Sequence, residues 1–291
     1  MTWGFLIVDK PQGMTSNQVV GAVKKATGVK KVGHAGTLDP MATGALVVGI
    51  GNVTRLIRFV QDQPKEYLAT ALFGVTTDTL DAEGAVLSRE PMDFQPGELE
   101  AIAPRFIGVI NQVPPMVSAL KRDGKRLYEL AREGKVVERE ARPVEIHELE
   151  FTSIGAGPYP EIEFRVVCGK GTYIRSLADD LAAVLGGSAH LTALRRTRIG
   201  SLKASQGVIV DDLANWHDYL LSPAEALADL PEVTVDEDTS NGVRNGMRFL
   251  GGDITSAPTD LPYRVLDGDG SLLAVYTTDG QQARPEVVLP S

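Results

Sequence analysis

The segment at residues 32–44, VGHAGTLDPMATG, constrains this chain more than any other part of its sequence, because it sets one carboxylate among small residues. It leads directly into the apolar run at residues 45–50. Glycine permits positive φ values and the close approach of a ligand, and Pro40 restricts the backbone directly after Asp39. The pattern predicts a carboxylate that is held rigidly but open to a guest molecule, or a simple Asp-Pro turn before a buried strand.

Length and composition predict a two-domain protein. The chain has 291 residues, and about 100–200 residues usually form one domain. Its 43% apolar content is enough for a packed core. No apolar run approaches the roughly 18 residues of a membrane-spanning helix, and the apolar stretch at residues 3–8 is too short for the core of a signal peptide. We therefore expect a cytoplasmic protein that does not enter the membrane, with a domain boundary near residues 230–231.

The reactive residue types predict no metal site and no cofactor. The single cysteine, Cys168, excludes an internal disulfide, and the four histidines show no metal-ligand spacing. Cys168 has no matched base, so we expect it to be a buried strand residue. The run CGKGT at 168–172 is not a phosphate-binding loop, because Phe164 stands where that loop needs its first glycine.

Charge is distributed unevenly along the chain. The net charge is −9, yet residues 1–60 carry a net charge of +5 and residues 211–291 a net charge of −11. Residues 121–142 hold eight basic side chains against five acidic ones. Such asymmetry can leave a basic face for nucleic acid on an acidic protein; the alternative is solvated surface charge without a partner.

Hydrophobic periodicity predicts an α/β protein of the α+β type. Ser16 can cap a helix that closes at Gly28, and further helices are expected at 53–61 and 172–185. Strands are expected at 5–8, 45–50, 67–75, 144–154 and 161–167, with short strand-like pieces after residue 230. Because strands and helices do not alternate strictly, a mixed sheet is favoured over a doubly wound parallel one.

Several segments in collinear order resemble a known family, the bacterial tRNA pseudouridine-55 synthases of the TruB type. The resemblance covers residues 3–210. The segments that carry it are KPQGMTS at 10–16, GHAGTLDP at 33–40, Tyr67 with TDT at 77–79 and Asp81, PPMVSALK at 114–121, GTYIR at 171–175, and LRRT at 194–197.

The resemblance implies a fold and a division of the chain. It implies a mixed, largely antiparallel central sheet with flanking helices, the pseudouridine-synthase fold, in a catalytic domain at residues 1–230. Residues 112–142 would be an RNA-binding insertion, and residues 231–291 a small β-rich module similar to the PUA fold. That module carries ten acidic residues and four arginines, so it should bind phosphates weakly except near Arg244 and Arg248.

The resemblance also implies a reaction. Uridine 55 in the T-arm loop of tRNA would be flipped from its stack and isomerised to pseudouridine, with no cofactor and no metal. Asp39 would be the nucleophile and Arg175 its ion-pair partner. Whether the carboxylate attacks C1′, attacks C6 or helps to remove a sugar proton is left open by the sequence.

The other site residues follow from the same resemblance. Tyr67 would stack on the target uracil, His34 would occupy the space that the flipped base leaves, and Tyr173 would line the pocket. The residues expected to contact RNA phosphates are Lys10, Lys121, Arg122, Lys125 and Arg126. The expected partner is the T-arm of tRNA, and we expect the protein to act as a monomer.

Two other functions remain compatible with the sequence. One is a non-catalytic tRNA-binding or RNA-folding protein that only traps a flipped base; it is disfavoured because a carboxylate facing RNA gives a pure binder no advantage. The other is a hydrolase of small glycosides, disfavoured because most glycosidases need two matched acids and none is matched to Asp39.

Overall fold

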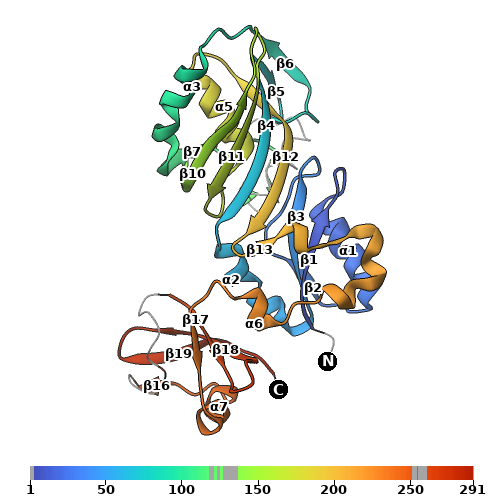
Figure 1. The fold of residues 1–291 in the computed structure, drawn as a ribbon, viewed down its shortest axis with the longest axis vertical. Helices are drawn as coiled ribbons and strands as arrows, with labels where there is room; N and C mark the ends of the chain where they lie inside the picture. The colour runs from blue at the N-terminus through green and yellow to red at the C-terminus, as the bar shows by residue number, and fades with distance from the viewer. Residues whose placement is uncertain are drawn as a thin grey trace. The chain divides into compact units, whose positions relative to one another are not determined.

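The computed structural model describes residues 3–117, 121–122, 125–126, 137–250, 254 and 261–290. The chain forms two compact units. The first unit contains Met1–Asp39, Gly44–Gln63 and Arg198–Ser291, and the second contains Pro40–Thr43 and Pro64–Thr197. Figure 1 shows the elements of each unit as a ribbon.

The first unit begins with strands that pair around β3, and the segment containing Asp39 leads into β3. Strand β1 pairs antiparallel with β3 and parallel with β14, while β2 pairs antiparallel with β3. The strands are β1 (Gly4–Lys10), β2 (Val32–His34), β3 (Thr43–Ile50), β13 (Leu202–Lys203) and β14 (Val208–Ile209). The apolar run after Asp39 is thus a buried strand, as its composition predicts.

The N-cap of the helix after β1 lies one residue earlier than the sequence predicts. In α1 (Ser16–Thr27) the N-cap is Thr15, whose side chain accepts a hydrogen bond from the Gln18 amide. The prediction that Ser16 is the cap is therefore wrong, because Ser16 is already inside the helix and its hydroxyl binds elsewhere. Gly28 ends the helix with φ 71°, as predicted.

A second small sheet lies in the C-terminal part of the first unit. Its strand order is β15-β17-β18-β19-β16, with α7 (Glu237–Arg244) against β18 and β19. The strands are β15 (Glu232–Thr234), β16 (Phe249–Leu250), β17 (Tyr263–Leu266), β18 (Leu272–Thr278) and β19 (Gln282–Val288). The expected small β-rich C-terminal part is present.

Apolar residues from both ends of the chain share one core in the first unit. Val275, Val287 and Leu289 belong to the same buried cluster as Phe5 and Val47. Deleting residues 231–291 would therefore expose apolar surface that is buried in the full chain, and the tail is better tested by point substitutions.

The second unit is a long, mostly antiparallel sheet. Its strand order is β12-β4-β11-β10-β7, and α5 (Ile174–Val184) lies against β4 and against α3 (Pro96–Ile102) (Figure 1). The strands are β4 (Lys65–Phe73), β7 (Gly108–Gln112), β10 (Arg142–Ile154), β11 (Glu161–Cys168) and β12 (Ala189–Ile199). The mixed, largely antiparallel sheet with flanking helices confirms the predicted fold class.

Short elements connect these strands. The expected helix at 53–61 is a 3-10 turn followed by one α-helical segment, and the expected strand at 67–75 breaks at Gly74, where φ is 82°. The remaining elements are η1 (Gly51–Leu56), α2 (Ile57–Asp62), β5 (Val75–Thr77), β6 (Val86–Arg89), η2 (Ala103–Phe106), β8 (Lys121–Arg122), β9 (Lys125–Arg126), η3 (Ala204–Gln206), η4 (Val210–Tyr219) and α6 (Pro223–Ala226).

Candidate active site

Asp39 lies on the irregular stretch of chain between β2 and β3. Its side chain is half-buried, and the preceding Leu38 is buried. Gly36 and Gly44 have φ values of 94° and 102°, conformations that L side chains rarely adopt. The Ala35 amide donates to the Val47 carbonyl at 2.8 Å, which fixes the start of the stretch on β3. Gly36 and Gly44 therefore allow the tight backbone conformation that the sequence predicts around Asp39.

Ser16 holds the residue directly before Asp39. Its buried hydroxyl donates to the Leu38 carbonyl at 3.1 Å and accepts from the Leu38 amide at 2.9 Å. Both polar groups of one loop residue are thus bound by a single side chain at the start of α1. The main chain of Leu38, next to Asp39, is thus held by a residue of α1, although Leu38 itself lies in no helix or strand.

Lys10 and His34 lie at the ends of the neighbouring strands. Lys10 is fully buried, and its ammonium donates to the carbonyls of Pro11 at 2.9 Å and Met14 at 2.6 Å. This placement favours a role in holding the turn at residues 11–14 over the predicted contact with RNA phosphate. His34 is half-buried at the end of β2, opposite Val48 in β3.

A buried ion pair occupies the second unit at the start of α5. The Arg175 guanidinium is 2% exposed and lies 3.2 Å from the Asp81 carboxylate. It also donates to the carbonyls of Thr79 at 2.7 Å and Val117 at 2.9 Å. Three acceptors in different directions use the planar fork of arginine, which lysine cannot reproduce. The orientation of Arg175 is therefore strongly determined.

The turn that carries Asp81 is itself held tightly. One carboxylate oxygen of Asp81 accepts from the Thr79 hydroxyl at 2.5 Å and from the Glu83 amide at 3.1 Å. Leu80 stands between Thr79 and Asp81, two of the three Arg175 partners, and has a φ of 59°, which is uncommon for a residue with a side chain. Such strain persists where the surroundings over-determine it, so this turn is built to present acceptors to Arg175.

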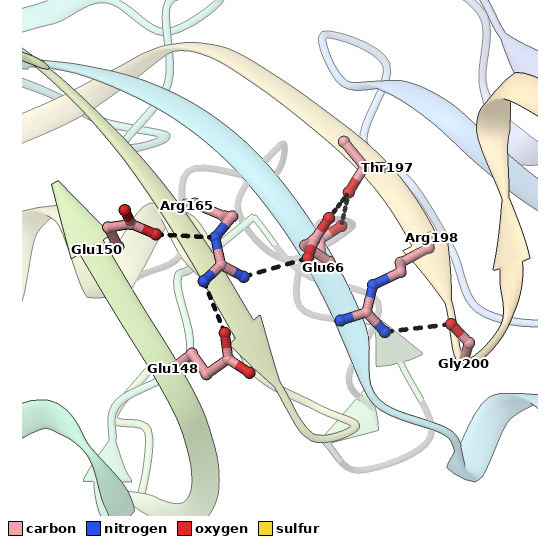
Figure 2. A network of polar contacts seen from close by, with 7 residues as sticks. All are labelled: Glu66, Glu148, Glu150, Arg165, Thr197, Arg198 and Gly200. Carbon is pink, nitrogen blue, oxygen red and sulfur yellow. Dashed lines mark hydrogen bonds and ion pairs between the residues drawn. The ribbon is translucent and has the colours of Figure 1, made fainter. Parts of the chain in front are cut away.

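Tyr67 is buried on β4, and its neighbour Glu66 belongs to a polar network on the opposite face of the strand. Arg165 binds Glu66 at 3.2 Å, and its other two contacts are with Glu148 at 2.6 Å and Glu150 at 3.2 Å (Figure 2). The hydrogen bond with Glu148 raises the pKa of Arg165. Three carboxylates around one guanidinium leave an acidic face, so Arg165 is not placed to bind RNA phosphate.

Tyr173 forms the N-cap of α5, and its main chain is bound by Gln112. The Tyr173 amide donates to the Gln112 side-chain oxygen at 2.8 Å, and the Gln112 side-chain nitrogen donates to the Tyr173 carbonyl at 3.1 Å. Ser176 donates to the Val113 carbonyl at 3.0 Å. The start of α5 is thereby attached to the end of β7, where the expected RNA-binding insertion begins.

Two adjacent acids on α5 have raised pKa values. The pKa of Asp180 is raised to about 6: burial is the largest cause, the charge of Asp179 also raises the pKa, and a side-chain hydrogen bond with Gln112 opposes both. Burial also raises the pKa of Asp179, against a hydrogen bond from the Ala189 amide that lowers it. Ionisation of Asp180 is therefore less favourable in the folded protein than in the unfolded chain.

We expect Asp180→Asn to stabilise the protein at high pH only. Because the pKa of Asp180 lies higher in the folded protein than in the unfolded chain, stability is lost as the pH rises from the unfolded pKa of about 3.9 through the folded pKa of about 6. Asparagine stays neutral, so near pH 8 its melting temperature should exceed that of the wild type by several degrees, on a scale of about 2–4 °C per kcal/mol. Thermal unfolding at about pH 3.5, below both pKa values, should show no difference; an equal gain at both pH values would contradict this assignment.

The predicted RNA-binding insertion is only partly described. Lys121 with Arg122 and Lys125 with Arg126 form the short antiparallel strands β8 and β9. Their side chains lie outside the described residues, as do residues 127–136 of the basic stretch. Exposed lysines in the first unit provide other positive charge, at positions 24, 25, 30 and 31.

Cys168 is buried, and burial raises the pKa of its thiol to about 11. A nucleophilic thiolate is therefore disfavoured. Among the described residues, no group of three or more histidine, cysteine, aspartate or glutamate side chains is placed to hold a metal ion. None of the helices in the described ranges is long and apolar enough to span a membrane.

Comparison of the sequence with models of known families shows which class of protein has this arrangement. Residues 24–174 match the model of the TruB family pseudouridylate synthase N-terminal domain, and residues 175–229 match the tRNA pseudouridylate synthase B C-terminal domain. The chain belongs to the TruB family of pseudouridylate synthases. It is therefore an isomerase, as the sequence predicts.

Relatives of this TruB-family protein match it over most of its length. A tRNA pseudouridine synthase B of Symbiobacterium thermophilum is 47% identical over 245 residues, which cover 84% of this chain and 82% of the relative. A protein of the same name from Thermobifida fusca is 42% identical over 296 residues, covering 99% of each chain. The resemblance predicted from the sequence is confirmed.

Solved structures show the same fold as this TruB-family chain. A Cbf5–Nop10–Gar1 complex contains a chain that matches 99% of this one with a TM-score of 0.77 and 26% identity, and 85% of that chain is covered. A chain in an H/ACA ribonucleoprotein bound to a substrate RNA containing 2′-deoxyuridine matches 99% of this one with a TM-score of 0.75 and 23% identity. Of that chain, 85% is covered.

The sequence alone indicates no role in the site for three polar residues of this TruB-family structure. Asp81 belongs to a segment that carries the resemblance, but only the fold shows that it pairs with Arg175. Gln112 is 1% exposed and Ser16 is 3% exposed. A buried glutamine or serine signals a required hydrogen bond, yet burial at an element boundary is not visible in a periodicity pattern.

Proposed function

We propose that this enzyme isomerises uridine 55 in the T-arm loop of tRNA to pseudouridine, with Asp39 as the nucleophile. The observation that carries the proposal is the placement of Asp39 in a glycine-bounded loop with its main chain fixed at Leu38, in a chain of the TruB family. Relatives at 40–47% identity are named tRNA pseudouridine synthase B, which supports tRNA as the substrate.

The reaction suits the residues that the chain offers. The bond between N1 and C1′ of uridine breaks, and a bond between C5 and C1′ forms. The proton lost from C5 is balanced by one gained at N1, so no group donor and no redox change are needed. A single carboxylate meets this requirement, and Asp39 is the residue we assign to it.

The remaining residues act on binding and orientation. We assign Tyr67 to stacking on the flipped uracil, which contributes about 1–3 kcal/mol against the few kcal/mol that flipping costs. His34 would fill the space left in the loop of the RNA, and Tyr173 would line the pocket. Arg175, fixed by Asp81, provides a guanidinium of determined orientation. We propose that the enzyme works as a monomer in the cytoplasm.

Recognition should depend on the T-arm and on phosphate contacts outside the acidic tail. Two of the four arginines in residues 231–291 are paired with acids in the structure, Arg244 with Asp267 at 3.2 Å and Arg264 with Glu232 at 2.7 Å. The exposed lysines at positions 24, 25, 30 and 31 are free of such pairing with carboxylates in the described part of the chain and are better placed to bind phosphates. The residue types of the insertion at 112–142 support the same role.

We expect an isolated T-arm stem-loop to be converted almost as efficiently as whole tRNA. Sequence-specific RNA recognition mostly engages loops and the adjoining backbone, and both are present in the stem-loop. Its kcat/KM should lie within about tenfold of that of tRNA, a difference of at most about 1.4 kcal/mol. Steady-state kinetics with mapped products measures this ratio.

The matched control is a stem-loop in which the target uridine is replaced by cytidine, which should bind but yield no product. Charge in the tail is controlled with Arg284→Ala, a change at an exposed arginine to which no phosphate contact is assigned, and it should leave both substrates almost unaffected. A stem-loop that is inert while whole tRNA is modified would contradict the assigned recognition and place it elsewhere on the tRNA.

A further inference from the structure

Ser16 and Leu38 form a buried contact between the start of α1 and the chain before Asp39. The two residues are 22 positions apart, and the serine hydroxyl serves as donor to the Leu38 carbonyl and acceptor for the Leu38 amide, at 3.1 and 2.9 Å. Ser16 is 3% exposed, as is Leu38. Both hydrogen bonds are therefore shielded from water, which cannot readily replace the hydroxyl if it is removed.

Thr15 and Ser16 make different hydrogen bonds, and this makes the contact between Ser16 and Leu38 specific. Serine at the start of a helix commonly caps the helix amides, but here Thr15 does so by accepting from the Gln18 amide at 3.2 Å. The Ser16 hydroxyl is directed to the loop instead. Two adjacent hydroxyl groups at the start of α1 thus have different roles: that of Thr15 caps the helix, and that of Ser16 binds the chain before Asp39.

The position of Leu38 determines what the contact can do. The Leu38 carbonyl belongs to the peptide that leads into Asp39, so holding Leu38 at both polar groups restricts this peptide plane and leaves the φ angle and the side-chain torsions of Asp39 to be set. A displacement of about 1 Å at a reacting group can cost about 100-fold in rate. A buried hydrogen-bonded serine next to the nucleophile is therefore placed to control the geometry of attack.

We propose that Ser16 is a positioning residue for Asp39. Ser16 holds the Leu38 peptide so that the Asp39 carboxylate points correctly at the target nucleotide. This inference rests on the proposed function, in which Asp39 is the nucleophile. Ser16 touches neither substrate nor reacting atoms in this scheme. Its effect is transmitted through one peptide group.

The test compares Ser16→Ala with Thr15→Ala in the full-length enzyme. Both variants remove one hydroxyl from the same helix turn, and both should lower the melting temperature, but only Ser16→Ala releases Leu38. We expect the single-turnover rate constant on unmodified tRNA, measured with saturating enzyme, to fall about 10–100-fold for Ser16→Ala. Thr15→Ala should keep the wild-type rate constant, and the Kd for RNA should stay within about threefold for both.

The rate constant separates positioning from loss of folded protein. Partial unfolding lowers the concentration of active enzyme but leaves the rate constant at saturation unchanged, whereas a misplaced carboxylate lowers the rate constant in folded enzyme. A wild-type rate constant in folded Ser16→Ala would overturn the proposal. An equal fall in Thr15→Ala would also overturn it, because the effect would then belong to the helix as a whole.

A second variant covers the case in which Ser16→Ala does not fold. Ser16→Cys fills nearly the same space, but its thiol is a weak donor and acceptor, so its rate constant should fall below that of the wild type. A wild-type rate constant in folded Ser16→Cys would overturn the proposal. If the wild-type enzyme itself forms no pseudouridine in tRNA, the proposed function fails and not the role of Ser16 alone.

Discussion

Asp39→Asn is expected to abolish pseudouridine formation while leaving the affinity for RNA nearly unchanged. The amide keeps the shape of the side chain but loses its charge and its nucleophilicity. Attack at C1′, attack at C6 and removal of a sugar proton all require the carboxylate, so each of the three routes is blocked. Single-turnover assays on unmodified tRNA measure the chemistry, and filter binding or fluorescence anisotropy measures the Kd.

The matched control is Asp93→Asn, which makes the same chemical change at an exposed residue in the second unit. It should keep the wild-type rate and Kd. Activity of Asp39→Asn within tenfold of the wild type would contradict the assignment of Asp39. A large loss of RNA affinity would instead indicate that Asp39 holds the loop in shape, since repulsion between a carboxylate and phosphates predicts no such loss.

Arg175→Lys is expected to lower both the rate constant and the stability of the enzyme sharply. Lysine keeps the charge, but it cannot reach the Asp81 carboxylate and the carbonyls of Thr79 and Val117 from one planar group. Each buried acceptor left without a donor costs about 1–3 kcal/mol. We therefore expect at least a tenfold lower single-turnover rate constant and a clear fall in the melting temperature.

Arg165→Lys provides the control for Arg175→Lys. Arg165 also binds several acceptors (Figure 2), but its side chain is 28% exposed, and its partners Glu148 and Glu150 are 54% and 62% exposed. Surface ion pairs contribute about 0–1 kcal/mol, so this variant should remain close to the wild type. Equal effects of the two substitutions, or an unchanged rate constant in Arg175→Lys, would contradict a special role for the buried pair.

The sequence was sufficient for the fold class and for most element positions. The apolar run after Asp39 and the alternating pattern of β11 follow from local periodicity, and the structure confirms both as strands. The cap of α1 was misplaced by one residue because threonine and serine stand side by side, and both are good N-caps. Only the contact with Leu38, 22 residues away, explains why Thr15 is the cap and Ser16 is not.

The candidate site was harder to predict where tertiary contacts decide a residue's role. Lys10 was expected to contact RNA phosphate, yet it is fully buried and its ammonium donates to the carbonyls of Pro11 and Met14. Asp81 was visible as part of a polar turn, but its pairing with Arg175 links residues 94 positions apart and cannot be inferred from spacing. Sequence patterns report local structure, whereas these partners depend on how distant strands assemble.

One measurement tests most directly whether this chain converts uridine 55 of tRNA to pseudouridine. Unmodified tRNA transcript is incubated with the purified enzyme, and every pseudouridine formed is mapped at nucleotide resolution. The account predicts a single new pseudouridine at position 55 with the wild type and none with Asp39→Asn. No pseudouridine with the wild type, or modification only at other positions, would contradict it.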